Sequence, residues 1–275
     1  MISKIRNIAS QLQAVYPADE ALALAWWIAE ELSGLSRAQL LCGCKDTTFL
    51  ANTQDIIERL LHFEPIQYIF GHVLWNGLDL KVTPATLIPR PETAEMVEKI
   101  ERLKVKGERM KVLDVGTGSG CIAIALKKRH PEWHVTGIDI SSEAIEVAKE
   151  NAKRNNVEVD FQVADIFNLQ SSISNLQYDI VVSNPPYICE GEKSSMKSNV
   201  LDYEPASALF VPDNDPLRFY RRIAELRLGR YLFFEINEAY PAEMEALLNR
   251  LGYTDIIVTK DMYGKARIIE GRMVG

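Results

Sequence analysis

The sequence contains few cysteines, and they form no recognisable pattern. Four occur among 275 residues: Cys42, Cys44, Cys121 and Cys189. Four are too sparse in a chain of this length for a disulfide framework. Cys42 and Cys44 are spaced as C-x-C rather than C-x-x-C, and no second pair follows. We therefore expect free thiols in a reducing compartment and no bound metal.

The chain also lacks long apolar runs and an excess of positive charge. No segment approaches the roughly 20 apolar residues that cross a membrane. The first residues, MISKIRNIASQLQAVYP, have neither the apolar centre nor the cleavage site of a signal peptide. The formal net charge is −7, which argues against the basic surface of a general nucleic-acid binder. We expect a cytoplasmic protein without a membrane-spanning segment.

Residues 1 to about 62 are predicted to be helical, with a short second amphipathic helix over 53–62. The helix over 20–32 is predicted to bury one face at helical spacing, made of Leu22, Ala25, Trp26, Ala29 and Leu32. For the Trp26-Trp27 pair, core packing is favoured over stacking on a ligand.

Residues 72–82 are predicted to form a β-hairpin that turns at Asn76-Gly77. The segment 83–92 contains three prolines and is predicted to be an ordered linker, in which Pro91 opens the next helix. The sequence therefore predicts an N-terminal helical domain over 1–70, a hairpin and linker over 71–90, and a catalytic domain over 91–275.

From Lys111 onward, predicted strands and helices alternate, which is typical of a doubly wound α/β sheet with its ligand at the carboxyl ends of the strands. Residues 190–200 are predicted to be a polar loop, and 216–228 a helix. The expected strands are 111–115, 134–139, 159–164, 179–183 and 231–236, followed by a C-terminal hairpin at 256–259 and 267–269.

A glycine-rich turn follows the first of these strands. It contains Gly116, Gly118 and Gly120, whose lack of side chains lets the backbone approach a ligand closely. The G-x-G-x-G spacing matches neither the dinucleotide fingerprint nor a P-loop. Asp139 ends the next strand, where a carboxylate accepts ribose hydroxyls. This combination suits an adenosine ligand without pyrophosphate, and S-adenosylmethionine fits, with Asp114 a candidate for an acidic lining.

Asp165 and Phe167 follow the third strand. In this fold that position lies beside the adenine, so Asp165 is a candidate to accept its amino group and Phe167 to cover the ring. A turn aspartate next to a core phenylalanine is an equally good interpretation of these two residues.

Asn184-Pro-Pro-Tyr187 follows the fourth strand and is the most informative tetrapeptide. A planar amide or amino nitrogen is a poor nucleophile unless its hydrogens are held by acceptors. The Asn184 side chain and the Pro185 carbonyl can serve as those acceptors, and Tyr187 can stack on the planar group. The motif predicts methyl transfer by orientation, without a strong base.

These motifs resemble those of the bacterial release-factor glutamine methyltransferases, and the resemblance covers nearly the whole chain. The matching segments are 65–71 (PIQYIFG), 86–93 (TLIPRPET), 114–120, 184–187, 203–210 (YEPASALF) and 261–267 (DMYGKAR). One departure is Glu235-Ile-Asn-Glu238, where the family usually has Glu-Ile-Gly and then Gln.

The resemblance implies a class I, Rossmann-like methyltransferase with a seven-stranded, mostly parallel sheet and a small N-terminal helical domain. It implies methylation of the Gly-Gly-Gln glutamine of class 1 peptide-chain release factors, with S-adenosylhomocysteine as product. Its implied cofactor-binding residues are Gly116, Thr117, Gly118, Ser119, Gly120, Asp139, Phe167 and Asn184. Its implied substrate-binding residues are Asn184, Pro185, Pro186 and Tyr187. It also implies that Arg90 and Glu92 border the site, although a linker salt bridge is an equally good interpretation of Arg90.

Three other functions are compatible with parts of the pattern. A nucleic-acid amino methyltransferase acting on adenine N6 or guanine N2 also uses Asn-Pro-Pro-Tyr, but the net charge of −7 disfavours it. A non-catalytic binding module has no reason to keep Asn184, Pro185 and Tyr187 intact. A nicotinamide oxidoreductase is disfavoured by the glycine spacing. We expect a monomer that binds no nucleic acid stably.

Overall fold

The computed structural model describes residues 1–42, 48–51, 53–103, 109–169 and 177–273. Contacts divide the chain into two units. One comprises Met1–Gly71 and Ser198–Tyr203, and the other comprises His72–Lys197 and Glu204–Gly275. The domain boundaries at residues 70 and 90 stay predictions.

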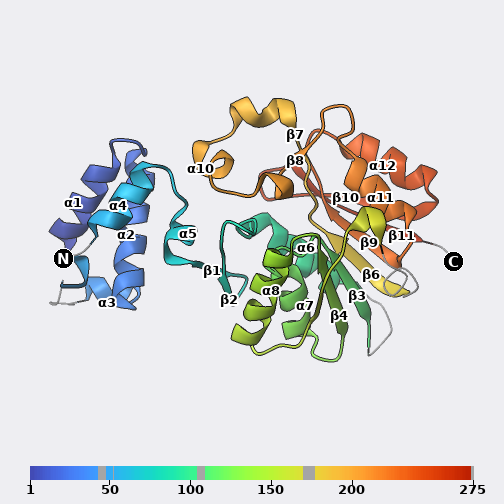
Figure 1. The fold of residues 1–275 in the computed structure, drawn as a ribbon, viewed down its shortest axis with the longest axis horizontal. Coiled ribbons are helices and arrows are strands. Elements are labelled where there is room, and N and C mark those ends of the chain that lie inside the picture. Colours follow the sequence, from blue (N-terminus) through green and yellow to red (C-terminus); the bar gives the residue numbers. More distant parts are fainter. Residues whose placement is uncertain (43–47, 52, 104–108, 170–176, 274–275) are drawn as a thin grey trace. The chain divides into compact units, whose positions relative to one another are not determined.

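The first unit is helical, as expected (Figure 1). Its buried aliphatic side chains form a core of their own. The hydroxyl of Tyr203 donates a 2.9 Å hydrogen bond to the carbonyl of His62. This bond holds the segment Ser198–Tyr203 in the first unit. Its elements are α1 (Ile2–Leu12), α2 (Ala18–Ser33), α3 (Arg37–Leu41), η1 (Thr48–Leu50), α4 (Gln54–Leu61), α5 (Ile66–Phe70) and α10 (Ser198–Leu201).

The face that we predicted for α2 is partly wrong. Leu22 and Leu32 are 42% and 36% exposed. The buried face instead consists of Ala21, Ala25, Ile28 and Ala29. Small side chains let a neighbouring helix approach closely, so the alanine-rich side of α2 packs inward in place of the leucines. Both tryptophans are half-buried against this core, as core packing predicted.

The predicted hairpin opens the second unit. Strands β1 (His72–Trp75) and β2 (Leu78–Lys81) pair antiparallel. Asn76 and Gly77 take φ values of 51° and 79°, as a type I′ turn requires. Asn151 of α8 (Ser142–Arg154) accepts from Lys81 N at 2.6 Å and donates to Lys81 O at 2.9 Å. These two bonds hold the hairpin on α8.

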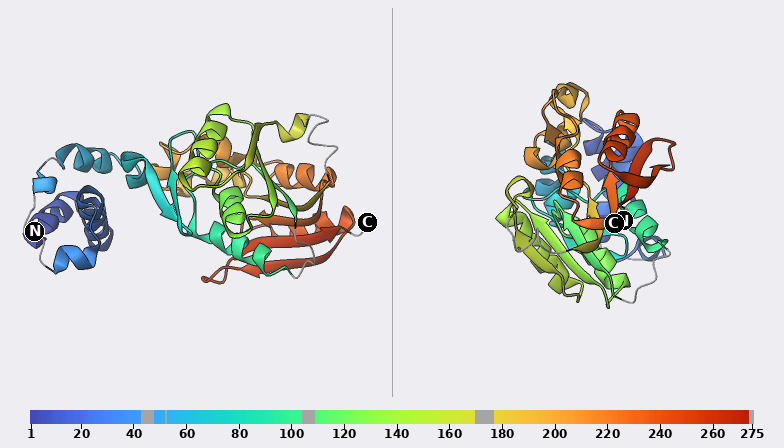
Figure 2. Two further views of the ribbon diagram at one scale, coloured as in Figure 1. Left: turned by 90° about the horizontal axis from the view of Figure 1, so that it is seen from below. Right: turned by 90° about the vertical axis from the view of Figure 1, so that its right-hand side faces the viewer.

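The second unit is built around a seven-stranded sheet in the order β10-β11-β9-β6-β3-β4-β5. Pairing is parallel from β9 to β5 and antiparallel between β9, β11 and β10, which confirms the predicted fold class. The C-terminal strands run side by side along one edge of the sheet (Figure 2). The strands are β3 (Lys111–Val115), β4 (His134–Asp139), β5 (Asp160–Val163), β6 (Tyr178–Ser183), β9 (Gly229–Glu235), β10 (Tyr253–Lys260) and β11 (Ala266–Met273).

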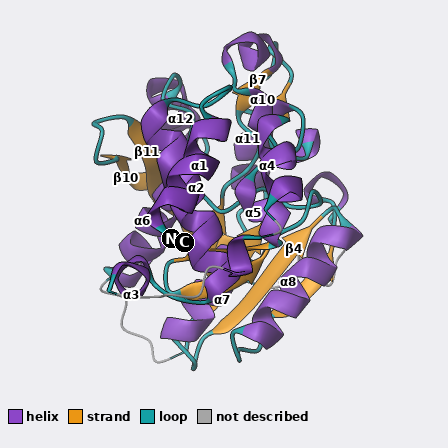
Figure 3. Cartoon of the chain, turned by 90° about the vertical axis from the view of Figure 1, so that its left-hand side faces the viewer, coloured by secondary structure: helices purple, strands orange, loops and turns teal. Residues whose placement is uncertain are grey.

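Successive residues of the central strands enter two separate cores. Val112 and Val182 face one core, while Leu113 and Val181 face the other, because side chains alternate along a strand. Helices cover both faces, as Figures 1 and 3 show. Residues of α6 (Pro91–Glu101), α7 (Cys121–Arg129) and α8 build the first core, and those of α11 (Arg218–Glu225) and α12 (Pro241–Arg250) build the second.

The predicted polar loop over 190–200 is instead largely helical. A 3-10 helix, η3 (Glu190–Ser195), precedes α10. Glu192 accepts a 2.8 Å hydrogen bond from the backbone N–H of Cys189 and so caps η3. The flanking strands β7 (Ile188–Cys189) and β8 (Phe210–Val211) pair in parallel, and η4 (Ala206–Ala208) lies between α10 and β8.

Three smaller expectations concern thiols, helix starts and membranes. Cys42, Cys121 and Cys189 are free, while Cys44 lies outside the described residues.

Helix α11 begins at Arg218, two positions after the predicted Pro216. In the described ranges, no helix has the length and apolar content needed to cross a membrane.

Candidate active site

The glycine turn connects β3 to α7 and lines a cavity of about 550 Å³. The N–H groups of Gly116 and Thr117 both donate to the carbonyl of Ile138, at 2.8 and 2.9 Å. Gly116 and Gly118 have φ values of +70° and +54°, and a Cβ at either position would meet no atom within 4 Å. Both lie in the cavity wall. The backbone at these two glycines is therefore open to a ligand.

Gly120 has a different surrounding from the other two glycines. Its φ is +80°, and an added Cβ would lie 3.0 Å from Ile124 and Phe161 and 3.1 Å from Ala148. The cavity wall includes Thr117 and Ser119 but not Gly120. Gly120 therefore lets α7 pack closely against its neighbours.

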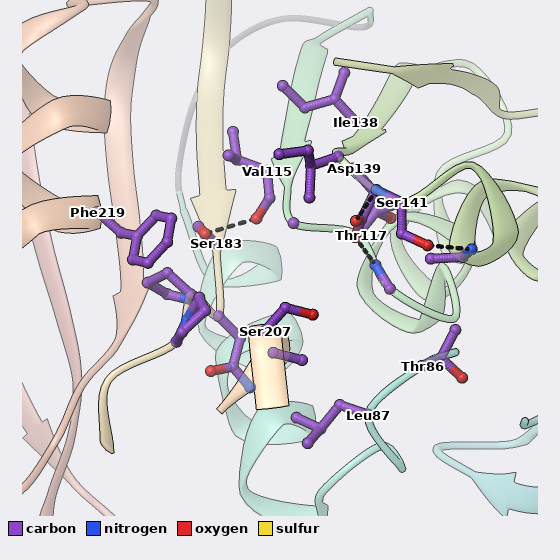
Figure 4. A pocket seen from close by; sticks show the side chains of 18 of the residues that line it. Thr86, Leu87, Val115, Thr117, Ile138, Asp139, Ser141, Ser183, Ser207 and Phe219 are labelled. Carbon is purple, nitrogen blue, oxygen red and sulfur yellow. Dashed lines mark hydrogen bonds between the residues drawn. The ribbon is translucent and has the colours of Figure 1, made fainter. Parts of the chain in front are cut away.

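Asp139 ends β4 and faces the cavity. Its Oδ2 accepts from Gly118 N at 2.9 Å, and its Oδ1 accepts from Ser141 N at 3.0 Å (Figure 4). Burial raises the pKa of this carboxyl, and the backbone N–H groups of Ser141, Gly118 and Ile140 oppose the increase. Each carboxylate oxygen can accept a second hydrogen bond, so Asp139 still has acceptor sites for a ligand hydroxyl.

Asp114 lies beneath the glycine turn and is fully buried. Burial raises the pKa of its carboxyl to about 7, against the opposing effect of the Thr117 hydroxyl. That hydroxyl donates to Asp114 Oδ2 at 2.7 Å. Asp114 is not part of the cavity wall, so its direct role in the structure is to hold the turn through Thr117.

Aromatic side chains form another part of the wall. Phe167, in η2 (Ile166–Asn168), packs edge-on against Phe219 with ring centroids 5.4 Å apart. In Figure 4, Phe219 and Asp139 lie on opposite sides of the cavity. Asp165 also lines the wall, but its oxygens accept from Phe167 N at 2.9 Å and Asn168 Nδ2 at 2.8 Å. Asp165 thus shapes the turn that presents Phe167.

Asn184-Pro-Pro-Tyr187 leaves the end of β6 at the same cavity. The Ser183 hydroxyl donates to Val115 O at 2.6 Å and fixes this strand end beside β3. Asn184, Pro185 and Pro186 line the cavity, whereas Tyr187 does not. The Tyr187 hydroxyl donates to Glu235 Oε1 at 3.2 Å.

Arg90 borders the cavity and is also in an ion pair, so the structure shows both features that the sequence left open. Its Nη2 donates to Glu204 Oε1 at 2.6 Å, and the Glu204 side chain is only 1% exposed. Glu204 Oε2 accepts from Ile88 N at 3.1 Å. One buried carboxylate therefore fixes the proline-rich linker next to the site.

Three polar residues at the site were not singled out from the sequence: Thr93, Glu204 and Glu235. Thr93 accepts from Asn184 Nδ2 at 3.3 Å and donates to Glu235 Oε2 at 2.6 Å. In the sequence, Glu235 is marked only by being a charged residue at the end of an apolar stretch of strand. Its partner is 142 residues away in sequence, so local patterns do not reveal it.

The departure from the family pattern at Asn237 adds contacts behind the motif. Asn237 Nδ2 donates to Tyr187 O at 3.1 Å and to Glu192 Oε1 at 3.3 Å. Its Oδ1 accepts from Ala239 N at 2.9 Å. This side chain joins the end of the motif to the η3 segment, as a glycine could not.

The chain matches two protein family models, one in each part of the chain. Residues 106–246 match the family model described as a methyltransferase domain, so the chain is a methyltransferase. Residues 4–71 match the PrmC N-terminal domain.

Two curated relatives match nearly the whole chain, and each is named a release factor glutamine methyltransferase. One, from Bacteroides thetaiotaomicron, is 46% identical over 95% of this chain and 96% of its own. The other, from Flavobacterium psychrophilum, is 40% identical over 97% and 98%. The chain belongs to the release factor glutamine methyltransferase family.

Solved structures support the fold. The human METTL16 catalytic domain in complex with the MAT2A 3'UTR hairpin 6 has a TM-score of 0.58 and 16% identity, covering 72% of this chain and 77% of that one. A methyltransferase from Pyrococcus furiosus has a TM-score of 0.52 and 18% identity, covering 80% and 99%. Both confirm a Rossmann-like methyltransferase fold.

Proposed function

We propose that this protein transfers a methyl group from S-adenosylmethionine to the side-chain amide nitrogen, N5, of the glutamine in the Gly-Gly-Gln motif of class 1 release factors. Membership of the release factor glutamine methyltransferase family supports the activity. The main structural support for the chemistry is that two groups of residues line one cavity. Asn184 and Pro185 form one group, and Gly116, Gly118 and Asp139 form the other. The acceptors for a substrate amide thus share one space with the elements of a nucleoside site.

The cavity fits the cofactor. Gly116 and Gly118 leave open space where side chains would otherwise intrude, and Asp139 offers acceptors to the ribose hydroxyls. Phe167 and Phe219 offer an apolar wall for the adenine. Thr117 and Ser119 complete the cofactor contacts that we propose. When bound there, S-adenosylmethionine supplies a methyl group on a positively charged sulfur.

The residues of the chain act on the substrate amide by orientation. We propose that Asn184 Oδ1 and the Pro185 carbonyl each accept one hydrogen of the amide NH₂, with Pro186 contacting the substrate beside them. Held by two acceptors, the nitrogen presents its lone pair to the methyl donor. On methylation the nitrogen becomes positively charged, the two acceptors stabilise that charge through its hydrogens, and one proton then passes to water. Arg90 borders the path of the glutamine.

Tyr187 needs a modified role. Its side chain does not line the cavity, so the structure offers no support for direct stacking on the substrate amide. Its hydroxyl is bound by Glu235 and its carbonyl by Asn237. We propose that Tyr187 stiffens the end of the motif and so holds Asn184 and Pro185 in place.

The proposal extends to partners and location. We propose that the enzyme acts as a monomer on its release factor. A net charge of −7 supports the absence of stable binding to nucleic acid. We place the reaction in the cytoplasm, where release factors act.

A methylation assay tests the proposal. Purified protein and labelled S-adenosylmethionine are mixed with an unmethylated class 1 release factor, with a variant whose motif reads Gly-Gly-Ala, and with duplex DNA. We expect label only on the factor with an intact glutamine. Label on DNA, or on the glutamine-free factor, would remove the substrate assignment.

A further inference from the structure

Glu235 is a buried carboxylate with both oxygens occupied. It ends β9 and is 1% exposed. Thr93 donates to its Oε2 at 2.6 Å and Tyr187 to its Oε1 at 3.2 Å. Thr93 itself is 2% exposed and belongs to the first turn of α6. A carboxylate so enclosed is stable only with such donors around it.

The Thr93 hydroxyl connects this carboxylate to Asn184. A hydroxyl has one proton to donate, and Thr93 donates it to Glu235. Its remaining lone pairs can only accept, and the group that donates to them is Nδ2 of Asn184, at 3.3 Å. An Asn side chain that points its NH₂ at Thr93 has its Oδ1 free for another donor.

Resting on the function proposed above, we propose that Thr93 and Glu235 are positioning residues that fix which end of the Asn184 amide meets the substrate. Glu235 sets the direction of the Thr93 hydroxyl, and Thr93 sets the direction of the Asn184 amide. The rotated amide would present NH₂ to the NH₂ of the substrate, two donors facing each other. Through Tyr187, the same carboxylate holds the other end of the motif.

Hydrogen bonds and charge around Glu235 act against the effect of its burial. Burial raises the pKa of its carboxyl, while the hydrogen bonds from Thr93 and Tyr187 and the charge of Arg267 oppose the increase. Arg267 is paired with Asp261 at 3.3 Å. Two donors and a nearby guanidinium therefore offset part of the cost of burying this carboxylate in its ionised form.

Thr93→Val is the decisive variant, because it keeps the shape and removes the hydroxyl. We expect kcat on a release factor to fall about 10- to 100-fold, on the scale of losing one oriented polar contact in a reaction. Thr93→Ser keeps the hydroxyl and should restore kcat to within about threefold. The Kd for S-adenosylmethionine should stay within about twofold in both, since orientation of the substrate amide is what changes.

Two further measurements separate positioning from general structure. In an Asn184→Ala background, Thr93→Val should cause no additional loss, because Thr93 acts through Asn184. Tyr253→Phe, which removes a buried 3.0 Å hydrogen bond to Ala224 O elsewhere in the same unit, should leave kcat unchanged.

The results that overturn the inference are distinct from those that overturn the function. Wild-type kcat in Thr93→Val, equal losses in the Val and Ser variants, or a further loss in the Asn184→Ala background would each reject the positioning role. A wild-type enzyme that methylates no release factor would instead reject the proposed function, before any variant is compared.

Discussion

Arg90 and Glu204 form a 2.6 Å ion pair across 114 residues of sequence. Arg90 precedes α6, and Glu204 follows α10. Glu204 also accepts a hydrogen bond from Ile88 N. The same carboxylate is therefore the acceptor for both a guanidinium and a backbone N–H group. Two loops of the cavity wall therefore depend on one charge pair, in which the Glu204 carboxylate is buried and the Arg90 side chain is 32% exposed.

Removing one member of this pair should strongly destabilise the second unit. Arg90→Leu leaves Glu204 buried without its cation, which costs about 1.5–3 kcal/mol for a charged hydrogen bond whose cation is partly exposed. Urea unfolding, followed by circular dichroism, measures the change. Lys149→Ala removes the exposed Lys149–Glu146 pair, with side chains 52% and 73% exposed, and should change the unfolding free energy by less than about 1 kcal/mol. Comparable losses in the two variants would contradict the importance of burial here.

The central sheet was predictable from sequence because its determinants are local. Strands β3 and β4 were predicted with the bounds that the structure has, and β6 starts one residue earlier than predicted. Buried parallel strands are short apolar runs, and glycine, serine and proline mark where each ends. Ligands of doubly wound sheets bind at the carboxyl ends of the strands, so the positions of the polar cavity residues at those ends could also be predicted.

The connections behind the site were not predictable in the same way. Thr93 reaches Glu235, and Arg90 reaches Glu204, only because the folded chain brings distant segments together. The face of α2 was misjudged for a related reason. Periodicity identified the helix, but Leu22 and the alanines compete for burial, and the partner helix decides between them.

Asp139→Ala should weaken cofactor binding. Loss of the ribose acceptor, and of the Gly118 and Ser141 hydrogen bonds, should raise the Kd for S-adenosylmethionine by roughly 10- to 100-fold, equivalent to one or two charged hydrogen bonds. Calorimetry measures it. Asp179→Ala is the control, since Asp179 accepts from Lys111 N at the opposite end of the sheet. Unchanged affinity in Asp139→Ala would rule out the ribose assignment.

Asp114 should make the protein less stable as pH rises from about 4 to 7. Its native pKa is about 7, above the ordinary value of 3.8. Between these values the unfolded chain has lost the proton that the native state keeps, so the unfolding free energy falls with pH and levels off above 7. The difference is at most roughly 4 kcal/mol.

Asp114→Asn removes this titration while keeping an oxygen for Thr117. Urea unfolding at pH 5 and pH 7.5 should therefore show a smaller decrease for the variant than for the wild type. Parallel decreases in both proteins would show that Asp114 does not titrate as its burial indicates.

Asn184→Ala should reduce methyl transfer to a small but measurable residual rate without unfolding the protein. Removing one preorganised polar contact to a reacting group typically lowers kcat by about 100- to 1000-fold. The residue is only half-buried, so the melting temperature should change little. Retained turnover on a release factor would refute the proposed polarising role, and a collapsed melting temperature would show a structural one.

Substitutions of Gly116 and Gly120 should affect different properties, cofactor affinity at Gly116 and stability at Gly120. Gly120→Ala combines a positive φ with a Cβ only 3.0 Å from Ile124 and Phe161, and should cost roughly 2–4 kcal/mol of stability. Gly116→Ala has the same backbone strain but open space around its Cβ, so its cost should stay near 1–2 kcal/mol. Urea unfolding compares the two.

Cofactor affinity should show the reverse order. The Cβ of Gly116→Ala enters the cavity where the backbone meets the ligand, and should raise the Kd for S-adenosylmethionine at least about 10-fold, one clash with a bound group. Folded Gly120→Ala protein should bind within a few-fold of the wild type, because position 120 is outside the cavity wall. If Gly120→Ala instead lost affinity while keeping its stability, Gly120 would belong to the cofactor site, as the family resemblance implies.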